Sequence, residues 1–181
     1  FCGIDSNKLY SGIHLRSYRI NTETGVAERI EDVPDTLGKI ASAASRIRDT
    51  IYLIGGYHVF EDGKEKSSNR VHRFDISRNR FAEDGANVPV PIDDQVQVVY
   101  KNRYIYLITG WSDKENVADV QVYDAEENRW FEGTPVPDSN AFKSFGASGC
   151  IVGDTIYYLG GASMGPNFPI QSVLRKGVIN P

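Results

Sequence analysis

The chain has 181 residues, with 24 Asp and Glu against 20 Lys and Arg and a formal net charge of −4 at pH 7. These charges are scattered without runs, so the sequence offers no basic face to a phosphate backbone, and no nucleic-acid partner is expected. No apolar stretch reaches the length of a membrane span, so no membrane partner is expected either, and 40% hydrophobic residues suffice for a buried core.

The chain begins with polar, turn-rich residues at 4–14, which predict a loop. A strand is expected over 15–20, followed by a tight turn over 21–25 in which Gly25 supplies a left-handed residue, and a short strand near Val26. The same pattern recurs as residues 71–75 with Phe81, and as residues 120–124 with Trp130. The sequence therefore predicts three hairpins of one kind.

Proline-bearing segments follow each hairpin, at residues 33–34, 88–91 and 134–137. Because proline cannot donate to a β-ladder, these segments are expected to be connections. Strands rich in small residues are expected next, over 40–45, 95–99 and 145–152. Small side chains suit a crowded innermost strand close to a central axis.

An apolar strand ending in glycine then completes each unit, at residues 49–56, 103–110 and 154–161, and the chain opens on the tail of another at Phe1–Gly3. The marker glycines Gly3, Gly56, Gly110 and Gly161 lie 53, 54 and 51 residues apart. A period of about 50 residues made of strands is typical of propeller blades. Strands without clean polar alternation are expected to be covered on both faces, here by neighbouring blades.

The order of apolar strand, Gly-Gly, Tyr-Asp (Tyr123-Asp124; Phe74-Asp75) and Trp (Trp130; Phe81) resembles the kelch repeat over essentially the whole chain. The resemblance implies an all-β kelch-type β-propeller, usually of six or seven four-stranded blades. About three and a half blades are expected in a single segment, 1–181: a partial blade over 1–30, blades over about 38–82 and 94–131, and an incomplete one over 144–181. Gly177 stands where the last copy should carry its aromatic residue. Further blades of the same protein, or a second copy, are expected to close the ring.

The long loops 4–14, 57–69, 111–118 and 162–171 are expected on one face, where kelch adaptors often bind a partner's peptide, as the resemblance implies. Exposed aromatic residues beside polar ones suit protein hot spots or stacking on sugars. The ligand-binding candidates are Tyr57, His58, Trp111 and Phe168, with Lys114, Lys143 and Asn167 as polar partners. The alternative is that each packs only its own loop. Trp130, Tyr52, Tyr106 and Tyr157 are expected to pack within and between blades.

Catalytic patterns are weak in this sequence. Gly161-Ala162-Ser163-Met164-Gly165 matches a nucleophile motif by letter, but two prolines exclude the helix that the mechanism needs and no His follows. The three histidines show no metal-ligand spacing, so neither a metal nor a cofactor is expected. The adjacent acids Asp93-Asp94 are interpreted as solvated loop charge.

The leading hypothesis is therefore a non-catalytic scaffold that binds a protein segment or a carbohydrate. The alternative is a sugar-acting propeller enzyme, such as a mutarotase or a galactose-oxidase-like protein, with its catalytic groups in blades outside this sequence. Cys2 and Cys150 fall at unrelated strand positions, which gives no disulfide framework, and nothing in the sequence indicates a compartment.

Overall fold

The structure is a computed structural model that describes residues 15–60 and 62–180, and within these ranges all regular elements are strands. The candidate loop 4–14 and Cys2 lie outside the described residues. The strands are β1 (Tyr18–Ile20), β2 (Ala27–Arg29), β3 (Ala43–Ile47), β4 (Thr50–Ile54), β5 (Tyr57–Val59), β6 (Glu65–Ser67), β7 (Val71–Asp75), β8 (Arg80–Phe81), β9 (Val96–Tyr100), β10 (Tyr104–Ile108), β11 (Trp111–Ser112), β12 (Glu115–Asn116), β13 (Val120–Asp124), β14 (Arg129–Glu132), β15 (Phe145–Val152), β16 (Thr155–Ala162) and β17 (Leu174–Val178).

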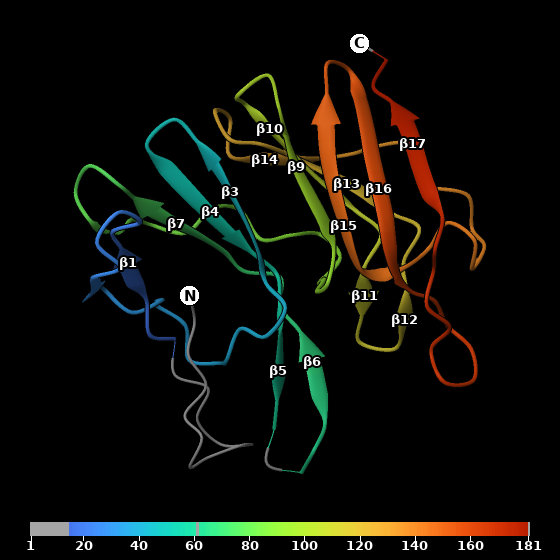
Figure 1. The fold of residues 1–181 in the computed structure, drawn as a ribbon, viewed down its shortest axis with the longest axis horizontal. Helices are drawn as coiled ribbons and strands as arrows, with labels where there is room; N and C mark the ends of the chain where they lie inside the picture. Colours follow the sequence, from blue (N-terminus) through green and yellow to red (C-terminus); the bar gives the residue numbers. More distant parts are fainter. Residues whose placement is uncertain (1–14, 61, 181) are drawn as a thin grey trace.

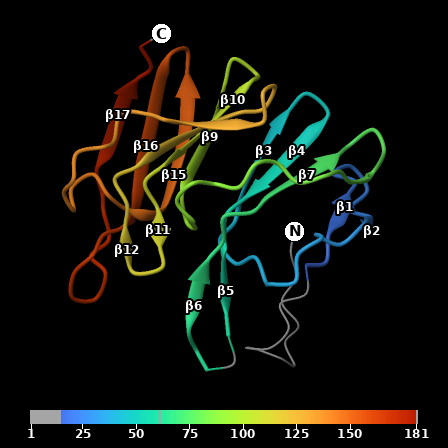
Figure 2. The same ribbon diagram turned by 180° about the vertical axis from the view of Figure 1, so that it is seen from behind.

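Three antiparallel sheets form the body of the molecule, and they lie side by side (Figures 1 and 2). Blade A has the strand order β3-β4-β7-β8, blade B has β9-β10-β13-β14, and blade C has β15-β16-β17. The first strands β3, β9 and β15 are neighbours across the sheets. The apolar glycine-ended strands β4, β10 and β16 lie in separate sheets, as the propeller prediction requires.

The short turn between the third and fourth strands shows why the Asp and Asn of the repeat matter. Asp124 Oδ1 accepts hydrogen bonds from the backbone N–H groups of Glu126 and Glu127, and Asn128 adopts a left-handed φ of 51°. Asp75 caps the equivalent turn of blade A in the same way, and Asn79 has a φ of 53°. Asn tolerates this conformation better than other residues with a side chain, so the pattern specifies the turn.

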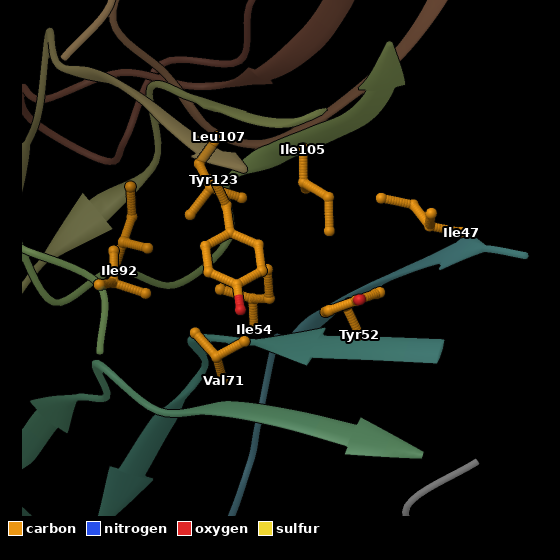
Figure 3. Close-up of a cluster of buried hydrophobic side chains, with 9 residues drawn as sticks. Ile47, Tyr52, Ile54, Val71, Ile92, Ile105, Leu107 and Tyr123 are labelled. Atoms are coloured by element: carbon orange, nitrogen blue, oxygen red, sulfur yellow. The ribbon is translucent and has the colours of Figure 1, made fainter. Parts of the chain in front are cut away.

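The interface between blades A and B holds one apolar core, shown in Figure 3. Ile54 and Val71 from blade A point toward Ile105, Leu107 and Tyr123 from blade B, and each of these five side chains is completely buried. Trp130 packs against the same core and donates from Nε1 to the carbonyl oxygen of Ala86 at 2.8 Å. The expected packing role of Trp130 agrees with this position.

A second core lies between blades B and C, and strand β10 serves both interfaces. Ile105 and Leu107 face blade A, whereas Ile108 is buried with Val120 and Tyr158 in the core toward blade C. Both faces of this strand are therefore covered, which explains why its sequence lacks polar alternation.

The far face of blade C is open in the described residues. Leu159 pairs with Leu174 in the register that pairs Ile54 with Val71 in blade A. Ile54 and Val71 are fully buried beneath blade B, but Leu159 and Leu174 are 56% and 62% exposed. Side chains two residues apart on a strand point to the same face. Tyr157 and its cross-strand partner Lys176 are two residues from Leu159 and Leu174, so Tyr157 lies on the same outward face.

Several predicted boundaries differ from the structure. The first strand of blade A begins at Ala43 instead of residue 40, because Ala41 adopts a left-handed φ of 52° and leaves Ile40 only an isolated bridge to Tyr57. Asp94 has the same conformation, with φ 51°, and delays the start of β9 to Val96. Residues 57–69 and 111–118 were expected to be loops, but they contain the small hairpins β5–β6 and β11–β12.

Candidate functional site

Two hairpins and one loop project from the same end of the blades, at the lower edge of Figure 1. They are hairpin β5–β6 from blade A, hairpin β11–β12 from blade B, and the segment 162–171 from blade C. We call this surface the hairpin face. It contains the connections between the second and third strands of each blade, which the sequence analysis predicts to bind a ligand.

Three aromatic rings meet on the hairpin face, and we call them the aromatic trio: Trp111, Phe145 and Phe168. The ring centroids lie 5.6 Å apart for Trp111 and Phe145, 6.3 Å for Trp111 and Phe168, and 5.7 Å for Phe145 and Phe168. All three pairs are edge-to-face, the geometry that aromatic rings prefer. Trp111 and Phe168 were both predicted candidates, and the structure brings them together although 57 positions separate them in sequence.

The backbone holds Phe168 in an unusual conformation. Asn167 and Phe168 have left-handed φ values of 62° and 45°, and Phe168 N–H donates to the carbonyl oxygen of Gly165. A bulky residue in this region is costly, and such strain clusters at binding sites. The result is a phenyl ring that contacts the other two rings and is still 50% exposed.

An acidic group lies beside the trio, at the junction of the two hairpins. Ser67 Oγ donates to Asp93 Oδ2 at 2.6 Å and accepts from the backbone N–H of Asp113 at 2.8 Å. Asp113 Oδ1 in turn accepts from Ser67 N–H at 2.8 Å, so the two hairpins are locked together. Asp93 is 2% exposed, which overturns its interpretation as solvated loop charge.

Burial changes the ionisation of the Asp93 carboxyl group. It raises the pKa of Asp93 to about 7, opposed by the hydrogen bond from Ser67 and reinforced by the nearby charges of Asp94 and Glu65. The pKa of Asp94 is raised as well, by burial and then by Glu65. Burial also raises the pKa of Tyr57, and the same carboxylates add to the effect. The phenol of Tyr57 therefore lies near the exposed Glu65, the half-buried Asp94 and the buried Asp93.

The pH dependence of stability gives a direct test of the buried carboxyl. Because the pKa of Asp93 is higher in the folded chain than in the unfolded chain, the folded state retains a proton that the unfolded state releases between about pH 4 and 7. The free energy of unfolding should fall across this window. We expect Asp93→Asn to remove that fall. The unfolding free energy of the variant minus that of the parent should therefore be about 1–2 kcal/mol higher at pH 8 than at pH 4.5. Urea unfolding at both pH values measures it, with the exposed Asp49→Asn as control. Parallel pH curves for parent and Asp93→Asn would contradict the assignment.

The remaining predicted candidates do not converge on the trio. His58 Nδ1 accepts the backbone N–H of Gly38 at 2.8 Å, and its ring packs edge-on against Phe60, so it fastens the hairpin to the preceding connection. Lys114 lines an open groove of about 690 Å³ between the hairpins, opposite Phe60 and Lys66. Lys143 pairs with Asp138 at 2.6 Å.

Sequence reasoning missed two members of the site. Phe145 was assigned only to the start of a strand, and Asp93 only to a loop. The available signal was the repeat itself, since Asp93 N–H and C=O exchange backbone hydrogen bonds with Trp111, as Ile40 does with Tyr57. Asp93 therefore occupies the position that Ile40 occupies in blade A. The replacement of this apolar residue by an acid is the signal in the sequence that marks the site.

Among residues 15–60 and 62–180, no cluster of three or more His, Cys, Asp or Glu is arranged to hold a metal ion. The same residues include no helix with the length and apolar character needed to cross a membrane.

Comparison with solved structures identifies the fold. The structure of YjhT, a kelch-repeat propeller protein, superposes with a TM-score of 0.71 over 84% of this chain and 54% of that one, at 14% sequence identity. The fold is therefore that of a β-propeller, of which this chain supplies part of the ring.

Sequence comparison identifies the repeat. Kelch-like protein 15 of Gallus gallus is 27% identical over 115 residues, and those of Danio rerio and Homo sapiens are 26% and 24% identical over the same length. Each match covers 64% of this chain but only 22%, 18% and 18% of the relative. No family model matches the chain. The repeats are therefore similar in sequence to those of kelch-like proteins, the fold is that of a kelch-type propeller segment, and the matched part spans about a fifth of the length of these relatives.

Proposed function

We propose that this chain is part of a binding scaffold whose hairpin face recognises a protein segment. The observation that carries the proposal is the aromatic trio with its half-exposed Phe168, held on a strained backbone by a rigid sheet. Binding hot spots are enriched in aromatic residues that present large areas at low entropic cost.

The edge-to-face packing favours a protein segment over a carbohydrate. Sugars bind by stacking on a flat ring, whereas in the trio each ring meets the edge or face of the other two. An apolar side chain of a peptide can instead wedge against the exposed part of Phe168. The adjoining carboxyl groups of the exposed Glu65 and the half-buried Asp94 add hydrogen-bond acceptors for the backbone or for a basic residue of that segment.

A peptide-display library panned on the chain tests this proposal. We expect enriched peptides to carry apolar or aromatic residues and to bind Phe168→Ala at least tenfold more weakly, since a central aromatic contributes about 2 kcal/mol. Ile170→Ala is the matched control, because Ile170 lies on the same segment and is 87% exposed. Equal losses for both variants, or none for Phe168→Ala at unchanged stability, would reject the site. A glycan array probed in parallel distinguishes the carbohydrate alternative.

One observation favours a second candidate, a sugar-acting enzyme. A carboxyl whose pKa is raised to about 7 can donate a proton near neutral pH, which is the property of a general acid. Asp93 would be that acid, with partner groups supplied by other blades. Sugar mutarotation measured on a complete ring, with and without Asp93→Asn, tests this second candidate.

A further inference from the structure

The Asp93 carboxyl lies at the junction of hairpins β5–β6 and β11–β12, between two blades that are both present in the chain. Its residue is 2% exposed, and its side chain receives a hydrogen bond from Ser67 Oγ at 2.6 Å. The charged side chains that act on it most strongly are acidic: Asp94 from its own connection, Glu65 from β6 and Asp113 from the turn between β11 and β12. A buried carboxyl among like charges favours its protonated form.

Ser67 connects this carboxyl to both hairpins. Its Oγ donates to Asp93 Oδ2 and accepts the N–H of Asp113, while Asp113 Oδ1 accepts the N–H of Ser67. The strands of the two hairpins have only two or three residues each. Hairpins this short are not stable by themselves in water. The three hydrogen bonds at the junction therefore help to hold the hairpins in place.

The backbone of Asp93 connects the junction to the aromatic trio. Asp93 N–H donates to the carbonyl oxygen of Trp111 at 2.9 Å, and Trp111 N–H donates to the carbonyl oxygen of Asp93 at 2.8 Å. Blade A has the same bridge between Ile40 and Tyr57, but an isoleucine cannot ionise. In blade B, a residue that can gain or lose a proton thus pairs directly with a member of the trio.

We propose that Asp93, Ser67 and Asp113 form a pH-sensitive latch, which fixes the two hairpins and Trp111 while Asp93 holds its proton and loosens when the proton is lost. The lost proton leaves a charge among acids, and local opening of the hairpins admits the water that solvates it. The phenol of Tyr57 on β5 also lies near the carboxyl, and its raised pKa keeps it neutral in this range. The role of the latch in regulating the hairpin face rests on the function proposed above, whereas the latch itself needs no partner.

The direction of the pH effect follows from the two states of the latch. Burial raises the pKa of Asp93 to about 7 in the closed state, whereas a solvated aspartate titrates near pH 4. The open state therefore releases the proton first as the pH rises. Opening should become more frequent between about pH 4 and 7 and should level off above pH 7.

Amide hydrogen exchange of the chain alone, followed by NMR, tests the latch. We expect the protection of the Ser67 and Asp113 amides, each relative to its intrinsic exchange rate at the same pH, to fall at least tenfold from pH 5 to pH 7. Asp93→Asn cannot ionise and should show no such fall. The N–H of Ile76 donates to the carbonyl oxygen of Asp49 in the turn between β3 and β4, and its protection should stay constant as a control.

The indole N–H signals of the two tryptophans test the connection to the trio. We expect the Trp111 signal to move with a midpoint near pH 7 in the parent chain and to stay fixed in Asp93→Asn. The Trp130 indole donates to the carbonyl oxygen of Ala86 and should stay fixed in both chains.

Three results would overturn the proposal. One is protection of the Ser67 and Asp113 amides that does not change with pH in the parent chain, a result that needs no variant to fold. Another is an equal fall in the parent and in Asp93→Asn. The third is a Trp111 indole signal that stays fixed in the parent chain. Neither measurement contains a partner, so their outcome is separate from the peptide panning that tests the hairpin face.

Discussion

Replacement of Gly56 by valine is expected to prevent folding or to cost more than about 4 kcal/mol of unfolding free energy. Gly56 lies two residues after the end of strand β4 and has a left-handed φ of 88°, and a Cβ there would press against Ser42 Oγ and lie 2.8 Å from the carbonyl oxygen of Ile40. Gly161 in blade C has the same restriction, since its Cβ would lie 2.5 Å from the carbonyl oxygen of Phe145. The backbone of the innermost strand passes too close to admit a side chain. Circular dichroism and urea unfolding measure the loss.

Gly25→Val separates this clash from backbone strain alone. Gly25 has a similar φ of 71°, but a Cβ there would meet nothing within 4 Å. We expect a loss of only about 1–2 kcal/mol, the cost of a left-handed residue with a side chain. Similar losses at both positions would mean that close approach of the strands is not the reason for the repeat's glycines.

Replacement of Asp35 by alanine is expected to cost about 3–5 kcal/mol of unfolding free energy, because it leaves the buried side chains of His72 and Lys39 without their carboxylate partner. Asp35 Oδ2 lies 2.9 Å from His72 Nε2 and 3.4 Å from Lys39 Nζ, and both of those side chains are completely buried. Burial alone would raise the pKa of Asp35, but hydrogen bonds from His72 and Leu37 and the charge of Lys39 hold it well below its usual range. The ionised Asp35, with His72 and Lys39 as its partners, therefore stabilises the fold above about pH 4, and this stability is lost as the pH falls and Asp35 becomes protonated.

The cost of Asp35→Ala should also depend on pH. Burial lowers the pKa of Lys39 to about 8, against the opposing attraction of Asp35. At pH 9 the amine is largely neutral, so the loss on removing Asp35 should be smaller there than at pH 6. Asp32→Ala is the control, since Asp32 pairs with Arg29 at the surface and should change stability by about 0.5 kcal/mol or less. Equal effects of the two substitutions would contradict a buried network.

The repeat made the architecture predictable. Period, strand order and the Asp-Asn turns all follow from local chemistry that recurs in each copy, and Trp130 and Tyr52 pack as the pattern indicates. The strand starts at Ala43 and Val96 could not be predicted, because a left-handed alanine or aspartate leaves no signature in composition.

The site was less predictable than the fold. Exposed aromatics on long connections directed attention to Trp111 and Phe168, but contact between blades B and C decides which rings meet, and Phe145 joins them from a strand. The burial of Asp93 arises from the small hairpins, which were interpreted as loops. His58 and Lys143 show the converse, since their partners Gly38 and Asp138 cannot be identified from spacing.

Each blade buries its apolar faces only against the neighbouring blades. We further propose that other blades of the same protein, or a second copy, cover the outward face of blade C, where Leu159 and Leu174 occupy the positions of the buried Ile54 and Val71. Sedimentation velocity of the 181-residue chain tests whether this outward face is covered in solution. We expect the chain to self-associate through that face, and we expect Leu159→Asp to weaken this association. A monodisperse 20.2 kDa monomer that unfolds in a single cooperative transition would contradict it.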